Sequence, residues 1–95
     1  MPTHEEICSA VRNAATSYPI QYASYFGSYA RGEQRDGSDL DLLVRFNRPV
    51  SLFLIAGLSL ELEEMLKVPV DVIKSPLPKE TILVIDKEVP CYGFQ

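Results

Sequence analysis

Three aspartates stand at spacings suited to metal binding. Asp39 and Asp41 are two residues apart in the segment SDLDLLVRF, and Asp71 lies in VPVDVIK. Aspartate disfavours strands, yet both segments have the aliphatic and β-branched pattern that is typical of strands. On a strand, residues i and i+2 leave the same face, roughly 7 Å apart along the chain. Bare carboxylates at that spacing repel each other, so the pair favours a divalent cation between them.

Magnesium suits such a pair of carboxylates. Mg²⁺ takes oxygen ligands in an octahedron, keeps several waters and is commonly completed by substrate phosphates. If a strand over residues 68–74 pairs with the strand over residues 39–46, Asp71 joins the other two acids. Three carboxylates on neighbouring strands suit two metal ions about 3.5–4 Å apart, which clamp the attacking and leaving oxygens in phosphoryl or nucleotidyl transfer. The alternative is that the aspartates only decorate solvated strand faces; for Asp71 alone the two interpretations are about equal.

A phosphate-binding turn is predicted just before the acidic strand. The stretch YFGSYAR ends a predicted strand at Gly27 and enters a short helical turn at Ser28. Glycine lets a ligand approach the backbone closely, and the N–H groups that open a helical turn favour anions. Gly27 and Ser28 are therefore candidates for holding a terminal phosphate. The motif is not a P-loop, because the Lys-Ser/Thr ending is missing.

Two further residues of this region leave alternatives open. Arg31 could donate a fork of hydrogen bonds to a phosphate, or it could be a surface cation paired with Glu33 or Asp36. Ser38 precedes the acidic strand, where it could orient Asp39 through a hydrogen bond or simply close the loop. The sequence does not decide between these roles.

The periodicity of the chain predicts the elements that position these residues. Apolar spacing after a capping box, alternating strand patterns and Pro or Gly breaks define them. They are a helix over 3–18, a strand over 20–26, a helical turn over 28–31, a strand over 39–46, a helix over 51–67, a strand over 68–74 and a last element over 78–89. The last element could be a helix or a strand, and its proline start and apolar spacing favour a helix. The order predicts an α+β domain, a small mixed α/β sheet with helices packed on one face, which leaves the carboxylate faces of the two strands open.

Composition narrows the class of protein. With 95 residues, 46% of them hydrophobic and 23% charged, the chain predicts one globular domain over residues 1–95. A net charge of −4 and a pI near 4.8 argue against a nucleic-acid groove. No apolar run approaches the ~18 residues of a membrane span. The opening segment MPTHEEICSA is unlike a signal peptide, so we expect a cytoplasmic protein with Cys8 and Cys91 as free thiols.

Together, the motifs carry a family resemblance. Gly27-Ser28, ten residues and then Asp39-Leu40-Asp41 form the pattern Gly-Ser-x10-Asp-x-Asp. This pattern resembles the DNA polymerase β-like nucleotidyltransferase superfamily, and within it the minimal nucleotidyltransferases (MNT) that are partners of HEPN-domain toxins. The resemblance covers nearly the whole chain and includes Asp71 as the third carboxylate. It implies the polymerase β-like nucleotidyltransferase fold.

The resemblance also implies roles for the site residues. Asp39, Asp41 and Asp71 would bind two Mg²⁺ ions and activate an acceptor hydroxyl for attack on the α-phosphate of ATP. Gly27 and Ser28 would hold the β- and γ-phosphates. In this family AMP passes to a tyrosine of the cognate HEPN toxin, so the transferase acts as the antitoxin of a toxin–antitoxin pair.

Two other functions stay open at the level of sequence. The helix over 51–67 is more apolar than one buried face requires, because Phe53 and Leu60 fall opposite its main apolar stripe. They could be covered by another element, or they could contact a partner chain. An antitoxin that neutralises its toxin by forming a non-catalytic complex is therefore an alternative. Nucleotidyl transfer to a small-molecule hydroxyl is another.

Overall fold

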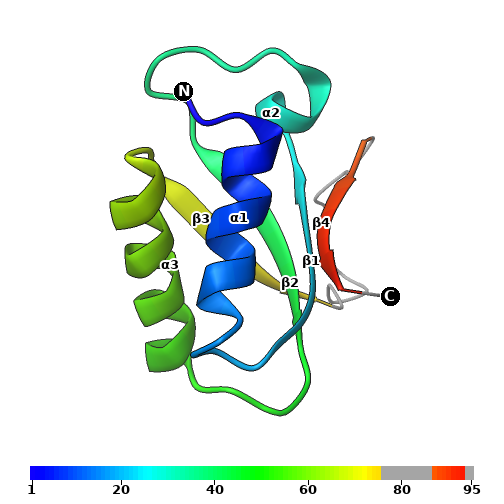
Figure 1. Cartoon of the computed structure of the whole chain (residues 1–95), viewed down its shortest axis with the longest axis vertical. Helices are drawn as coiled ribbons and strands as arrows, with labels where there is room; N and C mark the ends of the chain where they lie inside the picture. The colour runs from blue at the N-terminus through cyan, green and yellow to red at the C-terminus, as the bar shows by residue number, and fades with distance from the viewer. Residues whose placement is uncertain (76–86, 94–95) are drawn as a thin grey trace.

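Four strands form one sheet in this computed structural model, which describes residues 1–75 and 87–93 (Figure 1). The strand order is β3-β2-β1-β4, with β2 and β3 parallel and the other neighbours antiparallel. The elements in chain order are α1 (His4–Ala14), β1 (Ile20–Phe26), α2 (Ser28–Arg31), β2 (Leu40–Phe46), α3 (Leu52–Leu66), β3 (Val70–Ser75) and β4 (Val89–Gly93).

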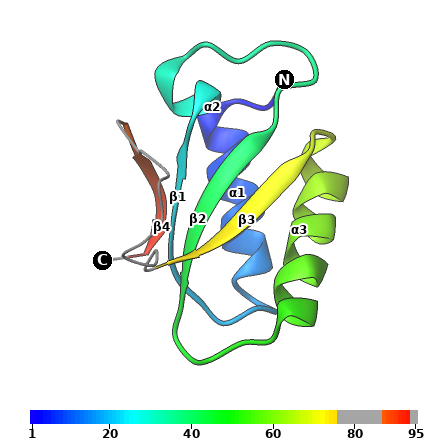
Figure 2. The ribbon, with the colours of Figure 1, turned by 180° about the vertical axis from the view of Figure 1, so that it is seen from behind.

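Helices α1 and α3 lie side by side on one face of the sheet, and the view from behind shows the strands in front of them (Figure 2). The short helix α2 lies at one end of the sheet, where β1 ends. This arrangement confirms the predicted mixed α/β architecture with helices packed on one face. No described helix is long and apolar enough to cross a membrane.

Local signals in the sequence explain where both long helices begin. Thr3 and Glu6 form the predicted capping box of α1, in which the Glu6 N–H donates to the Thr3 hydroxyl at 3.1 Å. Ser51 caps α3 by accepting the Leu54 N–H at 3.1 Å. Each cap satisfies backbone N–H groups that have no partner inside the helix.

The predicted end of the first helix was too late. α1 ends at Ala14, and the next residues form a turn in which the Tyr18 N–H donates to the Ala14 carbonyl at 2.9 Å. The Thr16 hydroxyl also donates to the Asn13 carbonyl at 2.7 Å. Pro19 disfavours helical geometry in the residue before it, so the chain leaves the helix early.

Strand β2 is the centre of the core. Its alternating residues Leu40, Leu42 and Val44 have no exposed surface, as the period of two predicts. They pack with Val11 of α1 and Leu58 of α3 in one apolar cluster. The helices therefore cover the Leu40–Leu42–Val44 face, and Asp41, which alternates with these residues, points to the other face of the sheet.

The C-terminal strand is a feature that the sequence analysis missed. A helix was expected from Pro78 to about Val89; residues 76–86 lie outside the described part, and Val89 begins β4 instead. β4 pairs antiparallel with β1 in a register that joins Tyr25 to Val89 and Tyr22 to Gly93. Strand β1 offers a second edge to be paired, and hydrogen bonds along such an edge outweigh a weak local pattern.

β4 also brings the two cysteines together. Cys8 of α1 and Cys91 of β4 are free thiols that lie close enough in space to shift each other's pKa, although they are far apart in sequence. Burial, and then the neighbouring Cys8, raise the pKa of Cys91 to about 12. Cys91 keeps some solvent exposure, so formation of the thiolate limits its reactivity more than access does.

We expect the alkylation of Cys91 by iodoacetamide to keep accelerating about tenfold per pH unit between pH 8 and 10. The thiolate fraction rises in that way below a pKa of about 12, whereas an ordinary thiol levels off near pH 9. Mass spectrometry of the native protein measures the rate, and the same protein in urea is the control. A native rate that levels off near pH 9 would contradict the burial of this thiol.

The raised pKa also affects stability. The protonated Cys91 thiol contributes fully to the stability of the fold below pH 9, and this contribution is lost toward pH 12.

Candidate active site

The register between β2 and β3 places two of the predicted carboxylates side by side. Asp41 lies opposite Asp71, and Leu40 lies opposite Val70. Neighbouring strands are about 4.8 Å apart, so the two aspartates share one short stretch of the sheet. Leu40 and Val70 are buried against the helices, whereas Asp41 is half-buried and Asp71 is exposed. Both carboxylates therefore lie on the face of the sheet away from α1 and α3.

Asp39, the third predicted carboxylate, affects the pKa of Asp41. Asp39 is exposed and lies just before the first residue of β2. Burial raises the pKa of Asp41, and the negative charges of Asp71 and Asp39 raise it further, whereas the positive charge of Arg31 lowers it. The structure thus brings the three predicted acids close enough to repel one another around Asp41.

Gly27 joins the phosphate turn to this acidic group. It follows Phe26, whose register partner on β2 is Asp41. Its backbone has φ 74° and ψ −150°, a region that is essentially reserved for glycine. A Cβ atom added here would lie 2.5 Å from the Asp41 Oδ2 atom. The backbone at Gly27 therefore passes directly against the Asp41 carboxylate, with no room for a side chain between them.

Ser28 opens α2 immediately after this contact. It is half-buried, and its carbonyl accepts the Glu33 N–H at 2.8 Å as the chain leaves the helix through Gly32. The Arg31 N–H donates to the Gly27 carbonyl at 3.1 Å and closes the turn. Ser28 is thus held at the edge of the acidic group, next to the glycine that touches it.

Arg31 and Ser38 each make contacts that bear on the alternatives left open by the sequence. The Arg31 Nε atom forms a salt bridge with Glu33 Oε1 at 2.8 Å on the surface, one of the two expected pairings. Its charge also acts on Asp41. Ser38 closes its own loop, because its hydroxyl accepts the Arg35 N–H at 2.8 Å and its N–H donates to the Arg35 carbonyl at 2.9 Å.

The donor set fits a hard divalent cation that keeps open positions. In residues 1–75 and 87–93, no three acidic, histidine or cysteine side chains are grouped closely enough to hold a metal ion by themselves. The negative charges of Asp71 and Asp39 nevertheless act on the half-buried Asp41, and this repulsion is the kind that a cation relieves. Mg²⁺ takes one or two carboxylates and completes its octahedron with water and phosphate oxygens, so it needs no closed cage.

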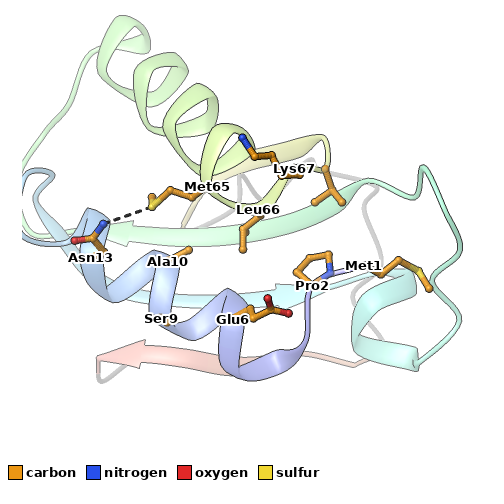
Figure 3. Close-up of a pocket in the computed structure, with 10 residues that line it drawn as sticks. Met1, Pro2, Glu6, Ser9, Ala10, Asn13, Met65, Leu66 and Lys67 are labelled. Atoms are coloured by element: carbon orange, nitrogen blue, oxygen red, sulfur yellow. Dashed lines mark hydrogen bonds between the residues drawn. The ribbon is translucent and has the colours of Figure 1, made fainter.

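A cavity of about 680 Å³ lies elsewhere, between one side of α1 and the C-terminal end of α3 (Figure 3). Glu6 and Asn13 line it from α1, and Met65, Leu66 and Lys67 line it from the end of α3. It lies on the helical side of the sheet and contains none of the three aspartates. The acidic group is thus an open surface site, which is consistent with a site completed by its substrate.

Comparison with known proteins identifies the family. A model of the nucleotidyltransferase domain family matches residues 8–90 of the chain. This protein belongs to that family. It is a nucleotidyltransferase.

Individual proteins support the assignment. The chain is 35% identical to the protein adenylyltransferase MntA of Thermococcus cleftensis over 94 residues, which are 94% of this chain and 95% of the relative. The fold is shared with a toxin–antitoxin crystal structure containing AMP-PNP, with a TM-score of 0.76 and 23% identity over 99% of this chain and 76% of the other. It is also shared with a chain of the complex of a tri-AMPylated Shewanella oneidensis HEPN toxin with an MNT antitoxin, with a TM-score of 0.71 and 16% identity over 97% and 74% of the two chains. These structures confirm the predicted polymerase β-like nucleotidyltransferase fold.

The Gly27→Ala variant tests the contact between the turn and the acid. We expect the new methyl group to turn the Asp41 carboxylate away, and the glycine-only backbone to cost roughly 1–3 kcal/mol of stability. Gly32→Ala is the matched control, because Gly32 also has a positive φ of 72° but nothing within 4 Å of an added Cβ. Urea denaturation and the carboxyl ¹³C chemical shift of Asp41 measure the two effects. An Asp41 signal that moves equally in both variants would contradict the contact.

Proposed function

We propose that this protein is an Mg²⁺-dependent adenylyltransferase that transfers AMP from ATP to a hydroxyl of a partner protein. The observation that carries the proposal is the close approach of the Gly27 backbone to the Asp41 carboxylate, because it joins a phosphate turn to a metal-binding acid. The register of Asp41 with Asp71 adds the third acid that two-metal transfer uses. Both features belong to a chain whose family transfers nucleotides.

Each residue of the site has one task in this proposal. Asp39, Asp41 and Asp71 hold the metal ions, and Gly27 and Ser28 offer backbone N–H groups and a hydroxyl to the outer phosphates of ATP. Bound Mg²⁺ would supply Lewis-acid activation of the α-phosphate and lower the pKa of the acceptor hydroxyl.

Two residues beside the aspartates have supporting roles in the proposal. Arg31, whose charge acts on Asp41, adds positive potential where the negatively charged nucleotide approaches. Ser38 keeps the loop before Asp39 closed.

We propose that the acceptor is a tyrosine of a cognate HEPN-type toxin and that the transfer makes this protein an antitoxin of the cytoplasm. The support is the likeness to the adenylyltransferase MntA, which is aligned over nearly its whole length. The fold is also that of an MNT antitoxin solved with a tri-AMPylated HEPN toxin. ATP as donor agrees with the AMP-PNP in the other toxin–antitoxin structure.

Labelled ATP tests the transfer directly. The protein is incubated with Mg²⁺, α-³²P-ATP and the product of the neighbouring gene, and we expect the label on a tyrosine of that product. Replacing Asp39 and Asp41 together by Asn removes two metal ligands and should lower labelling by more than roughly a hundredfold. Asp36→Asn is the control, because Asp36 is an exposed acid of the preceding loop. Full labelling by the double variant would disprove the mechanism, and label found only on small molecules would point to a small-molecule hydroxyl as acceptor.

An exposed apolar surface on α3 favours a second candidate function, neutralisation by complex formation. Leu52, Phe53 and Leu60 are 83%, 91% and 66% exposed, which is unusual for large apolar side chains on one helix. If binding alone silences the toxin, Phe53→Asp and Leu60→Asp should abolish neutralisation, while the double Asn variant at Asp39 and Asp41 should retain it. Toxin activity in the presence of each variant, with binding measured by calorimetry, separates the two functions. Neutralisation that depends only on the aspartates would rule out the binding function.

A further inference from the structure

The residue before Asp71 is bound on the outer edge of the sheet by side chains of α3. β3 is an edge strand, with β2 as its only neighbour in the described sheet. Leu40 of β2 lies opposite Val70 and donates its N–H to the carbonyl of Pro69 at 2.9 Å. In a parallel ladder with this register, the N–H and carbonyl of Val70 itself point away from β2. An edge strand normally leaves such groups to solvent.

Two side chains of α3 take both of these backbone groups. Glu63 accepts the Val70 N–H on its Oε2 atom at 3.0 Å. The Ser59 hydroxyl donates to the Val70 carbonyl. Ser59 and Glu63 are four residues apart on α3, so they lie on the same side of the helix, one turn apart. The helix therefore pairs with this residue as a neighbouring strand would.

The bound groups belong to the peptide planes that lead into Asp71. The Val70 carbonyl is part of the Val70–Asp71 peptide, so its hydrogen bond fixes the plane from which the Asp71 side chain leaves the strand. The Val70 side chain is only 2% exposed, which anchors the same residue in the core. The backbone in front of Asp71 is thus fixed on three sides, by the core, by β2 and by α3.

We propose that Ser59 and Glu63 are positioning residues, which hold the Asp71 carboxylate in register with Asp41 so that the two bind the same metal. The proposal rests on the function proposed above, in which Asp71 is a metal ligand. Neither residue touches the substrate or the metal; each acts through the backbone of Val70. Edge protection alone would stabilise the strand but would leave metal affinity unchanged, so the two roles can be distinguished.

Mn²⁺ titration by calorimetry tests this role without any measurement of activity. Glu63→Ala removes the acceptor of the Val70 N–H, and we expect Mn²⁺ affinity to fall by roughly tenfold, as for other groups that orient metal ligands. Glu63→Gln keeps a carbonyl oxygen that can accept the same hydrogen bond, so it should restore affinity to within about twofold. Glu64→Ala is the control, because Glu64 is the exposed next residue of the same helix. Ser59→Ala should weaken binding in the same direction as Glu63→Ala.

The Asp71→Asn background decides whether Glu63 acts through Asp71. If it does, Glu63→Ala should cause no further loss of Mn²⁺ affinity in that background, since coupled residues are not additive. Equal losses in both backgrounds, or a Glu63→Gln variant as weak as Glu63→Ala, would overturn the proposal.

Amide hydrogen exchange keeps failure of this proposal separate from failure of the proposed function. Glu63→Ala should speed the exchange of the Val70 amide in the metal-free protein, and unchanged exchange would overturn the proposal whether or not metal binds. A wild-type protein that binds Mn²⁺ but transfers no AMP would disprove the adenylyltransferase function alone. A wild-type protein that binds no Mn²⁺, either alone or with AMP-PNP present, would disprove both, because Asp71 would then have no metal to be positioned for.

Discussion

The parallel pairing of β2 with β3 is the constraint on which the site depends. Parallel strands need a crossover connection, and here α3 makes it while packing on the same face as α1. The register is fixed by burial, because Val70 opposite Leu40 must lie in the core. A slip of one residue would expose Val70 and turn Asp71 inward, at the cost of a buried charge. Hydrophobic packing on one face thus sets the carboxylate geometry on the other.

The acidic site opposes folding in the absence of a cation. Burial and the charges of Asp71 and Asp39 raise the pKa of Asp41, so the folded chain holds that proton more tightly than the unfolded chain does. This contribution to stability is present at low pH and is lost as pH rises through the raised pKa. In the proposed function, a bound cation would take the place of the proton and relieve the repulsion, which would couple metal binding to the stability of the sheet end where Gly27 meets Asp41.

Three sides of helix α3 have different surroundings. Leu58 and Leu62 are fully buried in the core. Ser59 and Glu63 bind the backbone of β3, and Phe53 points to solvent. The apolar residues of α3 are therefore spread around the helix and do not form a single stripe. This distribution explains why the sequence of α3 carries more apolar residues than one buried face requires. The crossover helix therefore connects the core, the backbone of β3 and an exposed apolar surface.

The sequence by itself determined the local elements and the types of residue in the site. The helix caps at Thr3 and Ser51 and the apolar alternation around Asp41 depend on only a few neighbouring residues. They therefore predict helices and a strand without knowledge of the tertiary structure. Tertiary structure alone decided that Gly27 touches Asp41, that β4 pairs with β1, and that α3 holds Val70. Those contacts join residues far apart in the chain, and they depend on which strand edges are free and on where a helix packs, which no local pattern encodes. The sequence determined which strands carry the aspartates, and the pairing of those strands determined that Asp41 lies opposite Asp71.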